Sequence, residues 1–460
     1  MYERNNQVEQ NIFETKNIKL LYLKMAIPVV LGMVVTLIYN LVDTYYISQT
    51  NNTALISGVS ICAPLFTFML AVGDIFGLGG SSVISRLLGE GKIEEARKKS
   101  SFCFYSSIIC SLFITFFMLI FKPEILSLLG TTNETFFYAE SYYKYLVLGS
   151  VTIIFSLVPS NLLRTEGYAV TSMAGTIFGT IVNIILDPIF IFKLNYGAAG
   201  AAIATIIGYS CTCAFFIFFI AFKSKKLSIR LSDLSFDFNT MRAILFIGLP
   251  ASITNLMQTI GLTLTNNSLN RYGYETVALM GVVLKVVNIA TLIIVGLAFG
   301  GQPIFGYNYG AKKYAKLKET ILFGMSLTAG TGIVFALTMS VFSNPIISHF
   351  FSDESLILSG AQMLRMQMIG IPLFAISLVI TCCFQSTGKA LSALLLSICR
   401  QGIVFVIVIK LLMEIFGLNG IIISQSVSDI VTVFIALILF RISLGKELFG
   451  SKEKSQKQDL

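Results

Sequence analysis

Long apolar segments recur along the whole of this 460-residue sequence, and they constrain its fold more than any other feature. Apolar residues fill 55% of the positions and charged residues only 12%, about half the charged share of an ordinary soluble domain. A helix that spans a bilayer needs roughly 20 apolar residues, because every backbone amide must be bonded inside its own segment. The pattern therefore predicts an all-α integral membrane protein with twelve transmembrane helices, at residues 20–48, 54–85, 100–121, 136–159, 171–193, 198–222, 243–267, 275–305, 319–343, 359–383, 391–413 and 419–440.

The basic residues indicate on which side of the membrane the termini lie. Most of the 33 Lys and Arg residues fall at the two ends of the chain and in the loops after even-numbered spans. Cytoplasmic loops carry an excess of Lys and Arg, so we expect a multi-pass protein of the cell membrane with both termini cytoplasmic. The net charge of +9 is explained by this topology, and no nucleic-acid partner is expected.

The two halves of the sequence repeat each other. Landmarks that match at a nearly constant separation along the chain are Gly79-Gly80 with Gly300-Gly301, Gly149 with Gly370, Pro28 with Pro250, and Gly200 with Gly420. Each half has an even number of spans, so we expect two pseudo-symmetric six-helix lobes related by an axis along the membrane normal. The predicted organisation is a cytoplasmic N-terminal segment 1–19, an N-lobe 20–222, a linker 223–242, a C-lobe 243–441 and a cytoplasmic polar tail 442–460.

Four polar residues of the first half fall at one depth of the predicted membrane. At about 1.5 Å of rise per residue, Asp43 lies roughly 28 Å along the first helix and Asp187 roughly 24 Å along the fifth, which also runs outward. Asn183 lies one turn before Asp187 on the same face. Thr205 lies about 10 Å into the sixth helix from its outer end. An ionisable side chain at such depth is costly, so each is a candidate functional residue.

These four residues carry oxygen ligands. Two carboxylates, an amide and a hydroxyl can bind Na⁺, or a buried carboxylate can take up a proton. Pro188 follows Asp187 and Pro28 interrupts the first helix, and each removes one helical hydrogen bond, so both helices are expected to bend. The alternative is structural: Asp43 would cap its helix and Asp187 would be a buried, hydrogen-bonded residue before a proline.

Three charged residues of the second half also fall inside predicted spans. Lys285, Arg400 and Asp429 each lie roughly 15 Å from the start of their helices. They are expected to form a structural ion network or to face a central cavity.

Other sites are not expected. The chain has one histidine and eight cysteines, and the cysteines fall inside apolar runs without a CxxC spacing. We therefore expect no cofactor and no metal other than a possible bound Na⁺. Isolated acids without histidine partners also argue against an enzyme.

Several segments resemble a known family. They are "AIPVVLGMVVTLIYNLVDTYYI", "SRLLGEGKIEEA", and "NIILDPIFIF" followed by "GAAGAAIAT". Together they are similar to the multidrug and toxic compound extrusion (MATE) family, in its MepA/DinF-like branch, along the whole chain.

The resemblance implies a V-shaped pair of lobes that alternate access, and efflux of amphipathic, often cationic compounds driven by Na⁺ or H⁺ entry. It places the family's N-lobe cation site on Asp43, Asn183, Asp187 and Thr205, with Pro28 as the bending proline. A NorM-like branch uses acids at places that here hold Gln258 and Ile376, which speaks against a C-lobe cation site. The expected functional unit is a monomer in membrane lipid.

Two other transport functions remain open. A flippase or exporter of a lipid-linked precursor or another endogenous metabolite would share the architecture, but several basic cavity residues would then be expected. A channel would need a filter motif or an oligomeric ring, and the sequence suggests neither.

Overall fold

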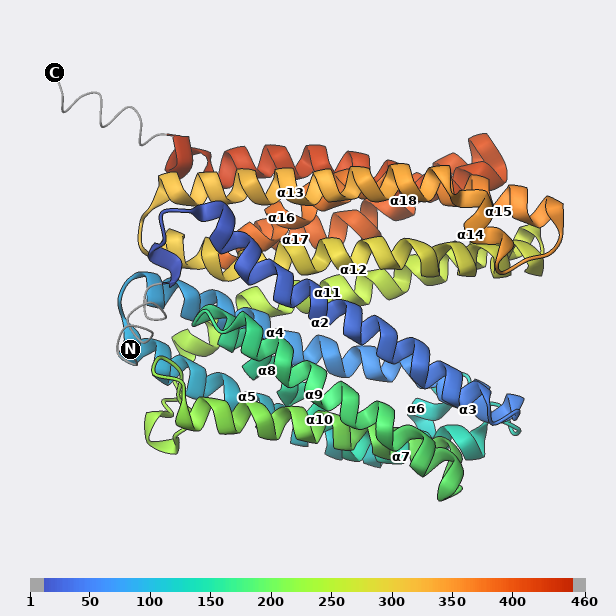
Figure 1. Cartoon of the computed structure of the whole chain (residues 1–460), viewed down its shortest axis with the longest axis horizontal. Coiled ribbons are helices and arrows are strands. Elements are labelled where there is room, and N and C mark those ends of the chain that lie inside the picture. The colour runs from blue at the N-terminus through green and yellow to red at the C-terminus, as the bar shows by residue number, and fades with distance from the viewer. Residues whose placement is uncertain (1–11, 450–460) are drawn as a thin grey trace. The chain divides into compact units, whose positions relative to one another are not determined.

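The computed structural model describes residues 12–449 and consists of helices joined by short loops (Figure 1). Within this range, ten helices are long and apolar enough to cross a membrane, and an eleventh span forms if one bent pair is counted as a unit. The predicted all-α membrane fold is confirmed. Residues 1–11 of the predicted N-terminal segment and 450–460 of the predicted tail lie outside the described residues.

The helices divide into two compact units. The unit that we call the N-unit is Leu31–Ser252, and the C-unit consists of the described residues 12–30 and 253–449. The N-unit contains α3 (Thr53–Ile61), α4 (Ala63–Gly89), α5 (Ile93–Ile120), α6 (Lys122–Leu128), α7 (Phe136–Leu148), α8 (Ser150–Thr165), α9 (Ala169–Pro188), the π-helical turn η2 (Ile189–Lys193), α10 (Gly197–Phe222) and the short turn η3 (Leu231–Asp233). Helices α7 and α8 form the bent pair, with an angle of 48° between them at Gly149.

The C-unit has a corresponding series. It contains η1 (Ile12–Glu14), η4 (Asn270–Tyr272), α12 (Tyr274–Gly310), α13 (Tyr314–Val341), α14 (Ser343–Ser348), α15 (Glu354–Met368), α16 (Ile371–Thr387), α17 (Ala390–Ile398), the π-helical turn η5 (Cys399–Ile403) and α18 (Val404–Phe449). Two long helices, α2 (Ile18–Ser48) and α11 (Phe238–Leu269), begin in one unit and end in the other.

The chain reverses direction within α18, at Gly417. This residue has φ 57° and ψ −127°, a backbone conformation that would be strained in a residue with a side chain. On either side of it, Ser392 and Ser443 lie 2.8 Å apart through their hydroxyls, and Lys389 and Glu447 form an ion pair of 3.0 Å. In two antiparallel helices, the residue numbers of contacting pairs add up to a nearly constant sum, as they do in these two pairs. The predicted spans 391–413 and 419–440 are therefore separate, antiparallel arms. Each of the twelve predicted spans then has its own helical segment.

The unit boundaries differ from those of the predicted lobes 20–222 and 243–441. The first part of α2 packs with the C-unit and the first part of α11 with the N-unit. The chain changes unit two residues after Pro28 and two residues after Pro250, so the boundary falls at the same place in both halves of the repeat.

Glycines explain why the first parts of α2 and α11 pack in this way. A Cβ atom at Gly79 of α4 would lie 2.5 Å from the carbonyl oxygen of Ile244 in α11. A Cβ atom at Gly300 of α12 would lie 2.3 Å from the Cα atom of Ala26 in α2. Backbones can approach this closely only where side chains are small. The repeated glycines found in the sequence therefore mark two equivalent helix crossings.

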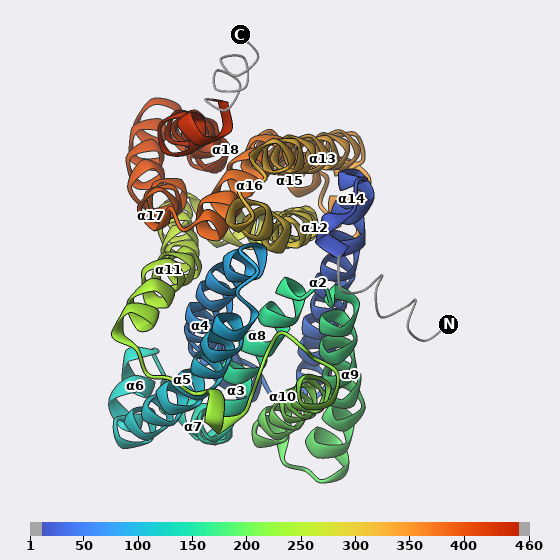
Figure 2. The same cartoon turned by 90° about the vertical axis from the view of Figure 1, so that its left-hand side faces the viewer.

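Helix packing repeats between the units as well. In the N-unit α8 packs against α4 and α5, and in the C-unit α16 packs against α12 and α13 (Figure 2). Each unit has its own apolar core, which includes Leu146 and Ile153 in the N-unit and Leu364 and Phe374 in the C-unit. The expected repeat of architecture is thus present.

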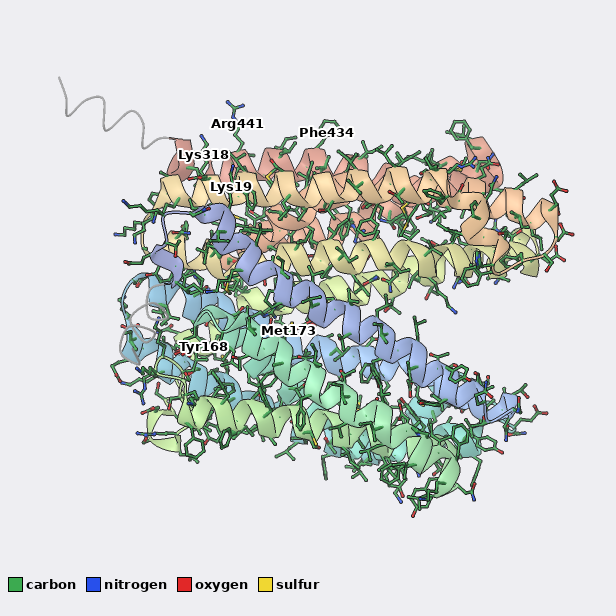
Figure 3. The ribbon with its side chains drawn as sticks, viewed as in Figure 1. Lys19, Tyr168, Met173, Lys318, Phe434 and Arg441 are labelled. Atoms are coloured by element: carbon green, nitrogen blue, oxygen red, sulfur yellow. The ribbon has the colours of Figure 1, made fainter. Side chains whose placement is uncertain are left out.

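Polar segments lie at the helix ends. In the N-unit, the Glu166 carboxylate accepts hydrogen bonds from the Ser224 hydroxyl at 2.5 Å and from the backbone N–H of Lys225 at 3.0 Å, which holds the start of the linker. In the C-unit, Lys19, Lys318 and Arg441 come from three helices and lie toward the same end of the unit (Figure 3). That end is the one predicted to be cytoplasmic, and the orientation itself stays a prediction.

Candidate functional site

A stripe of small and polar residues runs along α9. Gly175, Gly179, Asn183 and Asp187 are spaced by four residues and therefore lie on one face. All four are buried, with Asn183 3% exposed and Asp187 fully buried. This face packs against α10, which lies beside α9 in Figures 1 and 2. A polar pair is thus carried into a helix interface within the membrane-spanning region.

Glycines bring the two helices close together. A Cβ atom at Gly179 would lie 1.9 Å from the Thr212 hydroxyl oxygen and 2.4 Å from the Gly208 carbonyl oxygen. A Cβ atom at Gly208 would lie 2.9 Å from the Cβ atom of Asn183. The glycine contacts therefore hold Asn183 of α9 against the face of α10.

The remaining predicted residues approach from α10 and α2. Thr205 of α10 is 3% exposed, and its hydroxyl lies 3.4 Å from the hydroxyl of Tyr39 in α2. Asp43, one turn after Tyr39, is half-buried and lies within electrostatic range of Asp187. Three helices of the N-unit thus bring together the four residues that the sequence placed at one depth.

Three oxygens of this cluster have no hydrogen-bond donor among the described residues. They are Asp43 Oδ1, Asn183 Oδ1 and Asp187 Oδ2, and all three are buried. The other oxygen of Asp187 accepts a hydrogen bond of 3.3 Å from the amide of Asn183. A buried polar atom left without a partner costs about 1–3 kcal/mol, so such groups usually have an explanation. The shared feature here is an excess of acceptors over donors, which a cation or a proton would remove.

The ligand set indicates which cation fits. Carboxylate, amide and hydroxyl oxygens are hard ligands, which suit Na⁺ or a proton rather than a soft transition metal. Within residues 12–449 no group of three or more His, Cys, Asp or Glu side chains forms a metal site. Oxygens of this hard type are carried by Asp43, Asn183, Asp187 and Thr205.

Tyrosines around the cluster were not among the predicted site residues. Tyr39 contacts Thr205, and Tyr142 of α7 lies within electrostatic range of both Asp43 and Asp187. The four-residue spacing of Tyr39 and Asp43 could have indicated Tyr39. Nothing in the sequence connects Tyr142 to the cluster, because α7 is one arm of a span whose bend the sequence did not predict.

Two of the three deep charged residues of the C-unit come together. Arg400 of η5 and Asp429 of α18 form an ion pair of 2.8 Å. Lys285 of α12 is exposed and has no ion pair within the described part of the chain. The expected ion network therefore consists of one pair without Lys285.

At two of the four ligand positions the C-unit has hydrocarbon side chains instead. In the register that aligns Pro28 with Pro250, Asn183 corresponds to Phe405 and Asp187 to Ile409, and both of these are core residues that are 1% exposed. The architecture repeats, but the chemistry of this site does not.

The two prolines lie in different surroundings. The α-helix α9 ends at Pro188 and continues as the π-helical turn η2, directly after the buried Asp187. Helix α2 continues through Pro28, and the unit boundary follows two residues later.

Comparison with known proteins adds an independent observation. The sequence pattern of the MatE family matches residues 28–189 and, a second time, residues 250–411. The first match begins at Pro28 and the second at Pro250, which agrees with the internal repeat. The multidrug export protein MepA of Staphylococcus haemolyticus (strain JCSC1435) is 30% identical over 430 residues, which are 93% of this chain and 94% of that protein.

Solved structures agree with the fold. An outward-facing multidrug resistance MATE family transporter of the MOP superfamily matches with a TM-score of 0.90 at 24% identity, over 95% of this chain and 98% of that one. A MATE solved in complex with MaD3S matches with a TM-score of 0.88 at 25% identity, over 94% of this chain and 99% of that one.

Proposed function

This chain belongs to the MatE family of membrane transporters, and from that premise we propose that it exports amphipathic, often cationic compounds in exchange for Na⁺ or H⁺. The resemblance found in the sequence motifs is confirmed by the family match. The proposal extends it to a mechanism, in which the cluster of Asp43, Asn183, Asp187 and Thr205 is the coupling site.

One observation carries the proposal. Three buried oxygens of this cluster lack donors within the described chain, on residues drawn from two different helices of one unit. A bound Na⁺ would be attracted to all three, and a proton on Asp187 would turn one acceptor into a donor. Either ion would stabilise the arrangement in which Tyr39 of α2 contacts Thr205 of α10 and Asp43 lies near Asp187 of α9. A drug couples to the ion if it favours a different arrangement of the same helices.

Helix α2 offers a way to transmit this change. Its first part packs in the C-unit and its second part, which carries Tyr39 and Asp43, packs in the N-unit. Pro28 lies near the boundary and leaves the Lys24 carbonyl without its helical partner, so bending there is inexpensive. We propose that ion binding at Asp43 and Asp187 changes the course of the second part of α2, and that Pro188 lets the end of α9 adjust.

The relatives support the proposed substrate class. The S. haemolyticus relative is a multidrug export protein, and a related MATE binds MaD3S. The chain itself is rich in Phe and Met, with 38 and 15 copies, and such polarisable side chains adapt to varied apolar ligands. We propose that a monomer in the cell membrane, with cytoplasmic termini, transports these compounds.

The lipid-linked precursor flippase has less support. A pyrophosphate group would be expected to meet several deep cations. Arg400 is neutralised by Asp429, and Lys285 is the other deep basic residue that the sequence singled out.

Efflux in proteoliposomes tests the coupling site. Cationic dyes are loaded into vesicles, and a Na⁺ gradient and a pH gradient are imposed separately. Asp43→Asn and Asp187→Asn should each reduce gradient-driven efflux at least about tenfold, as expected when about 1.4 kcal/mol of ion binding is lost.

Asp353→Asn is the matched control. Asp353 caps α15 by accepting from the backbone N–H of Ser355 at 2.8 Å, and asparagine caps a helix equally well, so efflux should be unchanged. Full gradient-driven efflux by Asp187→Asn at equal protein content would rule out the proposed coupling site.

A further inference from the structure

The ion pair of the C-unit lies at a break in a transmembrane helix. Arg400 belongs to the π-helical turn η5, in which Gly402 has non-helical φ and ψ of −109° and −109°. The Ser428 hydroxyl of α18 donates a hydrogen bond of 2.7 Å to the Arg400 carbonyl. π-Helical turns that interrupt α-helices are frequently found at functional sites. A cation placed at this depth and at an irregular turn calls for a role.

The guanidinium of Arg400 lies between an acid and an aromatic ring. Its Nε atom is 2.8 Å from Asp429 Oδ1, and its central carbon is 3.8 Å from the centre of the Phe374 ring in α16. The amide of Gln425 donates to the same Asp429 oxygen at 3.3 Å. A carboxylate and a ring face together are the groups with which proteins bind organic cations.

Asp429 and Phe374 are the more deeply buried members of this cluster. The side chain of Asp429 is 4% exposed and Phe374 is 3% exposed, whereas the side chain of Arg400 is 20% exposed. A Cβ atom at Gly370 would lie 2.8 Å from the Cα atom of Ser426 and 3.0 Å from Asp429 Oδ2, so α16 and α18 are tightly apposed beside the acid. Arg400 is the outer and more exposed member of the cluster.

The position is related to the N-unit site. In the register that aligns Gly200 with Gly420, Thr205 corresponds to Gln425. In the N-unit, oxygens of the acids near this position lack donors within the described chain, and in the C-unit the acid is neutralised by a side chain of the chain itself.

We propose that Phe374 and Asp429 form a binding site for monovalent organic cations with delocalised charge, and that Arg400 is the tethered cation that occupies it. Ligands of the guanidinium or amidinium type compete with the Arg400 side chain for the ring face and the carboxylate. Arg400 thereby weakens the binding of organic cations to the C-unit and keeps Asp429 from acting as a second acid for Na⁺ or H⁺.

Chemical rescue tests this site without measuring transport. Arg400→Ala and Arg400→Gln remove the tethered cation, and ethylguanidinium is added to the purified, detergent-solubilised proteins. At a concentration of about one hundred times its Kd, the ligand should raise the Tm of these variants by about 5 °C. The wild-type protein should require at least about tenfold more ligand for the same shift.

The controls separate this site from general effects of the ligand. Arg365 is an arginine of α15 whose Nε atom donates to the Ser343 hydroxyl at 2.9 Å and to the Ser340 carbonyl at 3.3 Å. These partners are neutral, so Arg365→Ala should not be rescued. Adding Asp429→Asn or Phe374→Leu to the Arg400 variants should remove or reduce the shift.

The proposal is overturned if neither Arg400 variant is stabilised by ethylguanidinium, or if the shift persists when Asp429 is replaced by Asn. The measurement detects ligand binding and not transport. A negative result would therefore leave the proposed antiport function unaffected, and loss of antiport would leave this site unaffected.

Discussion

Asp187 and Asp429 are two deeply buried acids in opposite electrostatic situations. Asp429 has the Arg400 guanidinium at 2.8 Å and the Gln425 amide at 3.3 Å. Asp187 has only the Asn183 amide at 3.3 Å, and its second oxygen has no donor in the described chain. Removing a buried charge from water is expensive unless it is paired. Asp187 therefore has more to gain from a bound ion than Asp429 has.

Thr205 offers a test of the ligand set at the level of one atom. Thr205→Val keeps the shape of the side chain and removes the hydroxyl, which is both a proposed ion ligand and the partner of Tyr39. We expect the apparent affinity for the coupling ion to fall about two- to tenfold, because one polar contact contributes about 0.5–1.5 kcal/mol. The measurement is the concentration of Na⁺ or H⁺ that gives half-maximal efflux.

Tyr39→Phe separates the two roles of that hydroxyl. It removes the contact with Thr205 but no proposed ligand, so its effect should be smaller than that of Thr205→Val. An equal loss in both variants would mean that Thr205 acts by positioning α2 rather than by binding the ion.

The sequence grouped the members of the proposed site but not all of their surroundings. Depth and four-residue spacing are one-dimensional quantities, and they were enough to group Asp43, Asn183, Asp187 and Thr205. Pairing between helices depends on how each helix is rotated about its axis. For this reason the sequence could not distinguish a pair of Arg400 and Asp429 from a network that also includes Lys285.

At the level of elements, glycines decide how closely helices approach. Gly179 and Gly208 bring α9 and α10 together one turn from Asn183, and Gly79 and Gly300 form the two equivalent crossings with α11 and α2. The sequence showed that Gly79 and Gly300 are equivalent positions of the repeat. It did not show that they mark crossings, because the partner of each glycine comes from a distant segment, and this is also why the unit boundaries differ from the predicted lobes.

Replacing Gly179 should disturb both stability and transport. In Gly179→Ala the new methyl group would overlap the Thr212 hydroxyl and the Gly208 carbonyl, so α9 and α10 must separate. Overpacking of this kind costs about 1–3 kcal/mol, and we expect a lower Tm together with weaker ion-dependent efflux.

Gly330→Ala in α13 is the matched control. A Cβ atom there meets no atom within 4 Å, and alanine favours a helix more than glycine does, so Tm should stay equal or rise slightly. A Gly179→Ala protein with unchanged Tm and unchanged ion dependence would show that the α9–α10 contact does not position the site.

At the level of the whole molecule, we propose that a duplicated architecture carries one coupling site. The family pattern matches twice, beginning once at Pro28 and again at Pro250, and the same helix pairs pack in both units. Where the N-unit has Asn183 and Asp187, the C-unit has Phe405 and Ile409 in its core. We infer that the N-unit responds to the ion, and that α2, which connects the two units near Pro28, carries the response.

Ion flux driven by the drug tests this account most directly, because coupling between two ligands is reciprocal. In vesicles that contain the wild-type protein and no ion gradient, a cationic dye moving down its own gradient should drive Na⁺ or H⁺ in the opposite direction. Asp187→Asn should abolish this ion flux. Dye movement by the wild-type protein without flux of either ion, or undiminished ion flux in Asp187→Asn, would contradict the account.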